Sequence, residues 1–405
     1  LLAMGAASVH YLARPHIFTL LLVAASLWVL ERDRRRPDGW VWALAPLTVV
    51  WANLHGGFLA ILACIGMVGA GYGLKWLTGE TEARSRFLRY LGLGAVCAAG
   101  TLVNPYGYQL HVHIAQYLRS SWILEAVEEF QSPKFRAENM LQFEVLLFVG
   151  LGLTGLLLAR RKFPEALLVV FWAQQALASV RHAPIFALVA APILATELTE
   201  LWHRWTERKS RASIAGILRD LSCEFSRIPM RLSVWSPALV ATLALANGQN
   251  WPKDFPEIRF PVALVDKNVE VLAPKTGPMP RILSSDQWGD YLIYRFYPRM
   301  RVFVDGRSDF YGQEYGKEYI HLAGGHFSWQ KVADRYGFDL ALIPAEWPLS
   351  ELLKRDPAWR VRQDDGLGIL FERRASLMKS PHSAERLDRH SAQISTGVPE
   401  LGGKP

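Results

Sequence analysis

Apolar segments alternate along the first 250 residues with loops that are strongly basic at every second connection. The basic clusters fall at 31–36, 75–89, 160–162 and 203–231. In multi-spanning membrane proteins, loops rich in Lys and Arg stay on the cytoplasmic side. The alternation therefore predicts a polytopic α-helical membrane domain, with the remaining loops on the opposite, extracytoplasmic side.

We expect about eight membrane spans and one truncated span, each at or slightly below the length that a bilayer requires. Short spans are common where helices break around a cavity. The long outer loop at 106–139 carries an amphipathic stretch from Tyr108 to Leu118. The expected spans, starting with the truncated one, lie at 1–13, 15–30, 40–51, 58–76, 87–103, 140–159, 165–180, 184–202 and 234–246.

The chain divides into three regions. Residues 1–250 form the membrane domain, residues 251–375 are typical of a small extracytoplasmic α/β domain, and residues 376–405 are polar and expected to be disordered. The net charge of +8 is mostly explained by the basic loops, so we do not expect a nucleic-acid partner. In the α/β domain we expect strands at 281–284, 301–304, 338–343, 360–363 and 368–371, and helices at 291–297 and 349–355.

The chain begins at Leu1 inside an apolar segment, so we expect it to be a fragment that lacks its natural start. Of the three cysteines, Cys64 and Cys97 lie in apolar segments and Cys223 lies in a basic loop. No Cys or His set has the spacing of metal ligands. We therefore expect neither a structural disulfide nor a metal site made by these side chains.

Three outer ends of the expected spans carry Arg or His. An Arg fork can hold a phosphate or a carboxylate, and polar groups at membrane depth are costly and tend to be functional. The alternatives are a tight turn with satisfied polar groups at 53–57 and interfacial snorkelling of each Arg. Because several helix ends bring such residues to one face, we favour an anion site. Its candidate residues are Arg14, His16, Asn53, His55, Arg181 and His182.

Two further groups of polar residues fall on the same side. Asn104 begins the Asn-Pro-Tyr-Gly segment 104–107, where it binds a hydroxyl or only ends a helix. Glu125, Glu128 and Glu129 lie in the longest outer loop, where a carboxylate can act as a base or as a cation ligand. A solvated acidic loop is the alternative for each Glu.

The most distinctive motif of the outer domain combines acidic residues, Arg and aromatic residues in one short stretch. Glycines beside Asp290 and Asp305 predict tight loops that aim these side chains. One interpretation is a hydrogen-bonding pocket for a sugar or a peptide. The other is an internal ion-paired network that holds the domain together. The motif consists of Trp288, Asp290, Tyr291, Asp305, Arg307 and Asp309.

These motifs together resemble the multi-spanning glycosyltransferases of the GT-C class, and more closely a set of uncharacterised bacterial membrane proteins with the same order of motifs. The resemblance covers about residues 10–375. It implies an enzyme of the bacterial inner membrane that uses a polyprenyl-phosphate-linked sugar donor at the periplasmic face. The matching segments are 14–16, 51–57, 104–107, 129–133, 288–291 and 305–307.

A weaker resemblance links the outer domain to the catalytic subunits of oligosaccharyltransferases, whose Trp-Trp-Asp-Tyr-Gly motif binds the acceptor sequon. Trp288, Asp290 and Tyr291 match, but Gly289 replaces the second Trp and Leu292 replaces the final Gly. The GT-C class also carries an essential acidic motif in its first outer loop. We expect that motif upstream of this chain, so no catalytic residue is assigned within it.

The leading prediction is transfer of a sugar from a polyprenyl-phosphate carrier to a glycan, lipid or protein acceptor at the periplasmic face. Two alternatives stay open: a transporter or flippase for a polar lipid, and a non-catalytic scaffold whose outer domain binds a partner. A divalent cation, Mg²⁺ or Mn²⁺, would neutralise the phosphate leaving group. In the leading hypothesis, Arg14 and Arg181 hold the phosphate with the help of His16, His55 and His182. Asn53 and Asn104 bind hydroxyl groups. Glu128 or Glu129 supports the cation or the acceptor.

Overall fold

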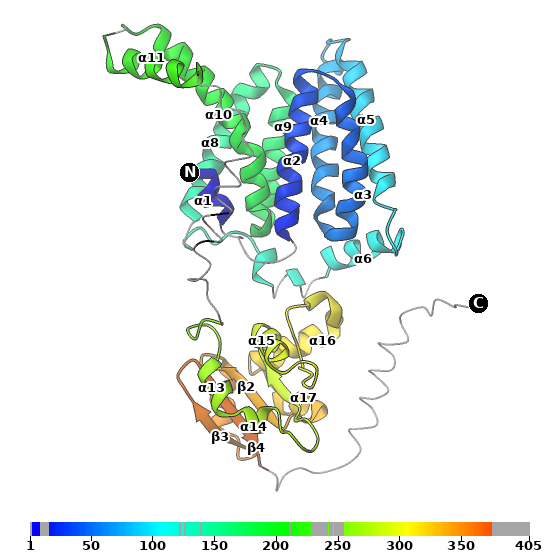
Figure 1. Ribbon diagram of the computed structural model, residues 1–405, viewed down its shortest axis with the longest axis vertical. Helices are drawn as coiled ribbons and strands as arrows, with labels where there is room; N and C mark the ends of the chain where they lie inside the picture. The colour runs from blue at the N-terminus through cyan, green and yellow to red at the C-terminus, as the bar shows by residue number, and fades with distance from the viewer. Residues whose placement is uncertain are drawn as a thin grey trace, which may run out of the picture. The chain divides into compact units, whose positions relative to one another are not determined.

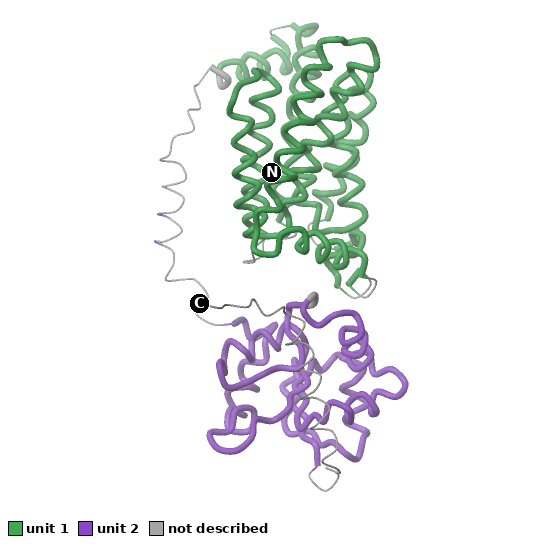
Figure 2. Tube along the Cα trace, turned by 90° about the vertical axis from the view of Figure 1, so that its right-hand side faces the viewer, with its two compact units in different colours: residues 1–231 green, residues 232–405 purple. Residues whose placement is uncertain are grey.

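The computed structural model consists of two compact units, residues 1–231 and 232–405, which are described separately (Figure 2). The side chains of 225–227, 308 and 309 are not part of the description. The structure describes residues 2–8, 16–120, 123–124, 127–137, 140–210, 212–227, 242, 246 and 255–374.

The first unit is a bundle of helices that run up and down beside one another (Figure 1). Pro and Gly residues end several of these helices, and four short 3-10 segments connect them. The elements are α1 (Leu2–Ser8), α2 (His16–Arg35), η1 (Gly39–Ala43), α3 (Leu44–Leu54), η2 (Gly56–Phe58), α4 (Leu59–Leu77), α5 (Ala83–Gly100), α6 (Gln109–Leu118), η3 (Glu128–Phe130), α8 (Met140–Ala159), α9 (Phe163–Ala178), η4 (Val180–His182), α10 (Ala183–Glu207) and α11 (Ile214–Arg227).

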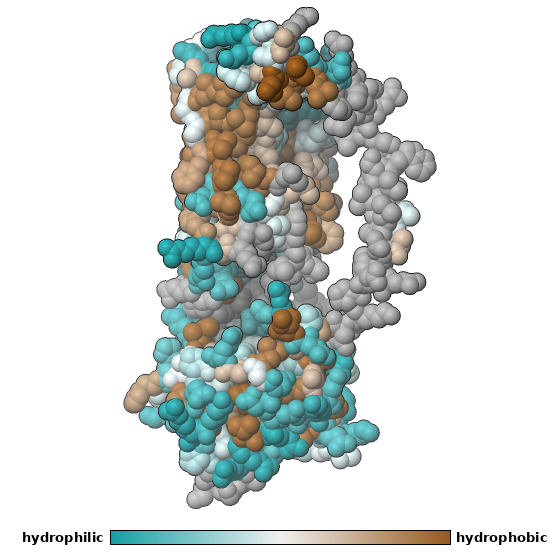
Figure 3. Space-filling model, turned by 90° about the vertical axis from the view of Figure 1, so that its left-hand side faces the viewer, coloured by the Kyte–Doolittle hydropathy of each residue, from teal (hydrophilic) through white to brown (hydrophobic). Residues whose placement is uncertain are grey.

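Within the part of the chain that the structure describes, three helical segments are long and apolar enough to cross a membrane: Gly56–Leu77, Met140–Ala159 and Val180–Glu207. Two shorter apolar helices, Gly39–Leu54 and Phe163–Ala178, pack in the same bundle. The helices of the bundle expose large apolar side chains, and the face in Figure 3 carries a broad hydrophobic area over the bundle. At this coarser level the predicted helical domain with membrane-length segments is confirmed. The expected last span at 234–246 lies outside the described residues, apart from 242 and 246.

The basic loops meet at one end of the bundle, as the alternation predicts. Arg89, at the start of α5, forms an ion pair of 2.7 Å with Asp33, at the end of α2. Arg161, between α8 and α9, donates to the carbonyl oxygen of Thr78, at the end of α4. Both contacts join loops that are distant in the sequence, so the ends of successive helices place their Lys and Arg residues on one side.

Buried carboxylates hold this basic end together. Asp33 has no exposed surface and also accepts a 2.9 Å hydrogen bond from the hydroxyl of Tyr90. Glu197, only 2% exposed, pairs with Arg160 at 2.6 Å and with Lys162 at 2.5 Å. A buried charge is tolerated only when it is paired and hydrogen-bonded, so these carboxylates fix the relative positions of the helices.

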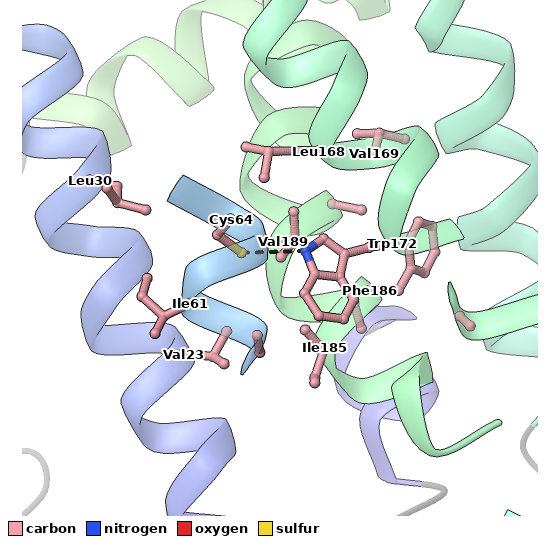
Figure 4. Close-up of a cluster of buried hydrophobic side chains, with 14 of the residues drawn as sticks. Val23, Leu30, Ile61, Cys64, Leu168, Val169, Trp172, Ile185, Phe186 and Val189 are labelled. Atoms are coloured by element: carbon pink, nitrogen blue, oxygen red, sulfur yellow. Dashed lines mark hydrogen bonds between the residues drawn. The ribbon is translucent and has the colours of Figure 1, made fainter. Parts of the chain in front are cut away.

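The centre of the bundle is a core shared by α2, α4, α9 and α10 (Figure 4). The indole N–H of Trp172 on α9 points at the sulfur of Cys64 on α4, 3.3 Å away. Gly71 lets α4 approach the start of α9, because a Cβ there would lie 2.4 Å from the nitrogen of Pro164. Packing between helices distant in the sequence therefore defines how the helix ends are arranged.

The second unit contains a mixed four-stranded sheet with the order β1-β2-β4-β3. Strands β1 and β2 are parallel and the other two pairs are antiparallel. The elements are α13 (Val262–Lys267), α14 (Val269–Leu272), β1 (Ile282–Ser284), α15 (Asp286–Phe296), α16 (Ser308–Ala323), α17 (Trp329–Tyr336), β2 (Leu340–Pro344), α18 (Pro348–Arg355), β3 (Trp359–Asp364) and β4 (Gly368–Arg373).

Both faces of this sheet are buried. Along β2, Ala341 and Ile343 belong to one hydrophobic cluster, whereas Leu340 and Leu342 belong to the other. Successive side chains of a strand point to opposite faces, so helices cover the sheet on both sides. Helices α16, α17 and α18 contribute to the cluster that contains Ala341 and Ile343. Helices α13, α14 and α15 contribute to the cluster that contains Leu340 and Leu342.

Four of the five expected strands are present, but the strand predicted at 301–304 is wrong. Phe303 and Val304 are both buried in the same cluster, which is incompatible with the alternation of a strand. The expected helix at 291–297 begins earlier, at Asp286, because the hydroxyl of Ser285 accepts a hydrogen bond from the N–H of Trp288. The predicted tail at 376–405 lies outside the described residues.

Candidate functional site

The candidate site lies at the end of the bundle opposite the basic loops. Helix α2 begins there at His16, α3 ends there beside His55, and η4 carries Arg181 and His182 between α9 and α10. The short η3 segment, which contains Glu129, packs against η4 at the same end. Each of these residues is thus delivered by a helix terminus or by a loop between helices.

His55 occupies an extended turn between two apolar helices and is anchored through one ring nitrogen. Its Nδ1 accepts a 3.1 Å hydrogen bond from the backbone N–H of Gly57 and lies 2.8 Å from the hydroxyl of Thr19 on α2. That hydroxyl accepts a 3.1 Å hydrogen bond from the indole N–H of Trp51. Thr19 therefore donates its own proton to His55, and the three side chains form one directed chain.

This chain sets the tautomer of His55. A backbone N–H can only donate, so Nδ1 uses its lone pair and the proton of the neutral ring resides on Nε2. His55 thus offers an N–H donor on the side of the ring away from Thr19. Gly57 makes the arrangement possible, because a Cβ there would lie 2.3 Å from the Thr19 hydroxyl oxygen.

Charged groups from three elements surround His55, which lies in the turn outside the neighbouring apolar helices. Burial lowers the pKa of His55, and the positive charges of Arg181 and then His16 lower it further, while Glu129 opposes them. The ring is therefore neutral at physiological pH. Arg181, His16 and Glu129, all three proposed for this site from the sequence, thus act electrostatically on the His55 ring.

Arg181 is held by an aromatic ring from the outer loop. Its guanidinium carbon lies 4.2 Å from the ring centre of Phe130, which is 5% exposed. Two hydrogen bonds of 2.9 Å attach this loop to the η4 turn: the Ser179 hydroxyl donates to the carbonyl of Glu129, and the N–H of Val180 donates to the carbonyl of Gln131. The loop and the η4 turn therefore position the guanidinium together.

His182 has a different anchor from that of His55. Its Nδ1 lies 3.2 Å from the carbonyl oxygen of Gln175 and must donate, because a carbonyl can only accept. Its ring packs edge-on against Trp172, with ring centres 6.1 Å apart. His182 therefore offers the lone pair of Nε2 and has no second N–H donor when neutral.

Three predicted residues have other tasks in the structure. Both amide hydrogens of Asn53 bond to backbone carbonyls, those of Val49 and Val103, at 2.8 Å. The Asn104 amide donates to two carbonyls within its own turn, and its oxygen accepts the N–H of Tyr106. Glu128 is solvent-exposed and pairs with Lys134 at 3.1 Å. Hydroxyl binding by the two Asn amide groups is therefore not supported.

Two candidate residues, Arg14 and Glu125, lie outside the described residues. Among the residues that the structure describes, no group of three or more His, Cys, Asp or Glu side chains is arranged to hold a metal ion. Among the described residues, Glu129 is the carboxylate that acts on His55, and the positive charge of Arg181 acts on the same ring. This donor set suits an anion and does not fit a divalent cation.

The outer-domain motif forms an internal network. Trp288 is 4% exposed, and its indole N–H donates to the carbonyl of Arg259 at 2.9 Å, while Tyr291 has no exposed surface. The tight loop predicted at Gly289 is wrong, since this residue lies inside helix α15. It is a glycine because a Cβ there would lie 2.0 Å from the carbonyl oxygen of Val304.

Asp305 and Arg307 belong to the same network. The carboxylate of Asp305 is 1% exposed and accepts hydrogen bonds from the backbone and the side chain of Arg307. Burial raises the pKa of Asp305, but the hydrogen bonds from Arg307 and Tyr311 outweigh it, so the net shift is downward. Asp290 accepts the N–H of Gly306 at 3.2 Å. These contacts favour the internal-network interpretation. The side chain of Asp309 is not described.

Sequence reasoning missed Thr19, Trp51 as an anchor, Phe130 and Ser179. Trp51 and Phe130 lie within segments that the sequence singled out, 51–57 and 129–133, so an aromatic residue beside a polar motif was the available signal. Thr19 lies inside an apolar segment, where a single Thr carries no such signal.

A scan against protein-family models finds no match for this chain, and a search among curated proteins also finds none. The functional proposal therefore depends on the geometry of the residues at the end of the bundle opposite the basic loops. We call these residues the outer cluster: His16, His55, Glu129, Phe130, Arg181 and His182.

Proposed function

We propose that this protein is a multi-spanning glycosyltransferase of the bacterial inner membrane that binds the phosphate of a polyprenyl-phosphate-linked sugar at its outer cluster. One observation carries the proposal: Arg181 and His16, from separate helix ends, both act electrostatically on His55 at the end of the bundle opposite the basic loops. Arginine and neutral histidine N–H groups are donors that match phosphate oxygens. A lipid-linked phosphate would reach this end from the bilayer.

The membrane location rests on the three segments of membrane length and on the apolar sides of the bundle. The proposal extends this to about eight spans, with the basic end cytoplasmic by the positive-inside rule. With that topology, the outer cluster and the C-terminal unit both belong to the periplasmic side.

The proposed chemistry is displacement at the anomeric carbon of the donor. The oxygen of an acceptor hydroxyl forms the new bond to that carbon and gives its proton to the Glu129 carboxylate. The bond between the carbon and the phosphate oxygen breaks, and the phosphate leaves with the bonding electrons. Negative charge therefore builds on the phosphate, where fixed donors lower the barrier most. Arg181 and the Nε2–H of His55 are the donors that we assign to the phosphate, and Glu129 is the carboxylate that we assign to the acceptor side.

Binding of a polyprenyl phosphate to the purified protein in nanodiscs tests the anion site. Loss of a charge-assisted hydrogen bond costs about 1.5–3 kcal/mol, so Arg181→Gln should weaken binding by roughly 10- to 100-fold. Arg84→Gln is the matched control, because Arg84 stacks on Trp76 at the basic end and should leave binding unchanged. Equal affinity of the Arg181→Gln variant and the wild type would contradict the site.

The transfer reaction needs its own measurement. Donor loaded with a radiolabelled sugar is incubated with proteoliposomes and a membrane extract that supplies acceptors. Release of polyprenyl phosphate together with a labelled acceptor supports the glycosyltransferase. Movement of intact donor across the bilayer without release would instead favour a transporter that uses the same anion site.

A further inference from the structure

The last helix of the first unit, α11, presents its apolar side to solvent. Ile214, Ile217, Leu218 and Leu221 recur at helical spacing and form one stripe, and all are exposed, from 46% to 79%. In a globular protein such a stripe faces the core. In α11 it faces away from the rest of the bundle, so the helix needs an apolar partner that the bundle does not supply.

The opposite side of α11 is the one that contacts the bundle. Gly216 is buried, and Arg219 is 16% exposed and donates a 3.1 Å hydrogen bond to the carbonyl of Thr206 at the end of α10. The hydroxyl of Ser213 accepts the N–H of Gly216 and caps the first turn. These contacts orient the helix with its apolar stripe outward, so the exposure is a built feature of the fold.

The surroundings of the stripe indicate its partner. Helix α10, which is part of a segment of membrane length, leads into α11 at the basic end of the bundle (Figure 1). Trp202 and Trp205 lie in its last turns with ring centres 5.4 Å apart, and Lys209 lies over the Trp205 ring. Paired tryptophans beside lysine are typical of the boundary between hydrocarbon and headgroups.

The charge around α11 is complementary to an anionic surface. Between 208 and 227 the chain has five basic residues and two acidic ones. A helix with an apolar stripe and a basic border binds at the headgroup level of a bilayer, with a strength that depends on anionic lipid. An ordinary protein partner would not account for the adjoining tryptophans and membrane-length helix.

We infer that α11 is an interfacial helix that lies on the anionic cytoplasmic leaflet with Ile214, Ile217, Leu218 and Leu221 in the headgroup and acyl boundary. The inference rests on the membrane location that is part of the proposed function. It adds a lipid-binding element at the end of the protein opposite the outer cluster. Its role is to hold the end of α10 at the membrane surface in a way that responds to the lipid charge.

The full chain can be tested with a fluorescent label on one cysteine. Cys223 is exposed and lies half a turn away from the apolar stripe, whereas Cys64 and Cys97 are buried. Labelling native Cys223 therefore probes the polar side, and labelling Ile217→Cys in a Cys223→Ser background probes the stripe. Both proteins are placed in vesicles of phosphatidylcholine with phosphatidylglycerol, which contain a brominated lipid as quencher.

The inference predicts strong lipid quenching at position 217 and little at position 223. Replacing Arg208 and Lys209 with Gln should weaken the membrane contact of the helix by roughly fivefold per charge removed, and only in vesicles that contain phosphatidylglycerol. A water-soluble quencher is added in a parallel measurement. Quenching of the label at position 217 by this aqueous quencher would overturn the inference. So would a label shielded from both quenchers, since that result identifies a protein partner.

A label at Phe148→Cys, in the Cys223→Ser background, separates this inference from the proposed membrane location. Phe148 is 65% exposed in the middle of the segment Met140–Ala159. Lipid quenching at position 148 without quenching at position 217 would overturn the interfacial helix alone. Absence of quenching at both positions would overturn the helix and the membrane location together.

Discussion

The guanidinium group of Arg181 stacks over the ring of Phe130, with its carbon 4.2 Å from the ring centre. The two residues come from different loops, which are joined by the hydrogen bond from Ser179 to the carbonyl of Glu129. A guanidinium that rests on an aromatic face keeps its edge available for hydrogen bonds. The donor edge of Arg181 therefore remains able to meet an anion while its position is restrained.

Phe130→Ala should weaken binding of a polyprenyl phosphate by roughly 2- to 30-fold, because the cation–π contact is worth about 0.5–2 kcal/mol. Phe130→Tyr retains the aromatic face and should bind like the wild type. Titration of the lipid in nanodiscs measures both affinities. Unchanged binding by the alanine variant would show that Arg181 is positioned without the ring.

Thr19→Val should lower the free energy of unfolding by about 1–3 kcal/mol, because it leaves the buried N–H of Trp51 without an acceptor. Thr19→Ser keeps the hydroxyl and should lose less. Thr154→Val is a matched control, since that hydroxyl bonds only to the carbonyl of Gly150 in its own helix. Thermal unfolding in detergent compares the variants, and an equal loss for Thr19→Val and Thr154→Val would contradict the Trp51–Thr19–His55 chain.

Asp33→Asn should destabilise the bundle by about 3–5 kcal/mol, because it removes the charge that pairs with the guanidinium of Arg89. Glu80→Gln removes one partner of a partly exposed pair with Lys75 at 3.5 Å and should cost less than about 1 kcal/mol. Unfolding by denaturant measures the difference between the variants. Similar values for both would show that the buried carboxylate is not a structural anchor.

Gly289→Ala should destabilise the C-terminal unit although alanine favours helices by about 1 kcal/mol. The added Cβ would lie 2.0 Å from the carbonyl oxygen of Val304, which is too close for any adjustment of a side chain. Gly155→Ala, also within a helix but with no atom within 4 Å, should be neutral or stabilising. The rate of proteolysis within 262–373 distinguishes them, and a wild-type rate for Gly289→Ala would refute the close approach.

Acid should weaken the contact between Asp305 and Arg307. The folded-state pKa of Asp305 lies below the ordinary value of 3.8, so its contribution is complete above that value and is lost as the pH falls through the folded pKa. Asp305→Asn should therefore be less stable than the wild type at neutral pH, with the difference shrinking in acid below 3.8. Proteolysis of the C-terminal unit across this range measures it, and a pH-independent difference would contradict the ion pair.

The sequence alone determined the apolar helices of the first unit and the common end of their basic loops. Both depend on local patterns: apolar runs of membrane length form helices, and helices that alternate in direction bring every second loop to one side. Strands β1, β2, β3 and β4 were predictable for the same reason, because their apolar residues recur within a few positions. The segment 301–304 was not, since Phe303 is buried there by contacts with Tyr315 of α16 and Tyr336 of α17. The sequence also did not predict α11, which forms within the segment 203–231 that we expected to be a basic loop.

Only the tertiary structure decided which polar residues meet. The sequence proposed Asn53, Asn104 and Glu128 on the same grounds as His55 and Arg181, because all occur where a helix ends. Hydrogen bonds to nearby carbonyls occupy the two amides, and solvent surrounds Glu128. Such outcomes depend on packing between helices far apart in the chain, as does the anchoring of His55 by Thr19, and no local pattern encodes them.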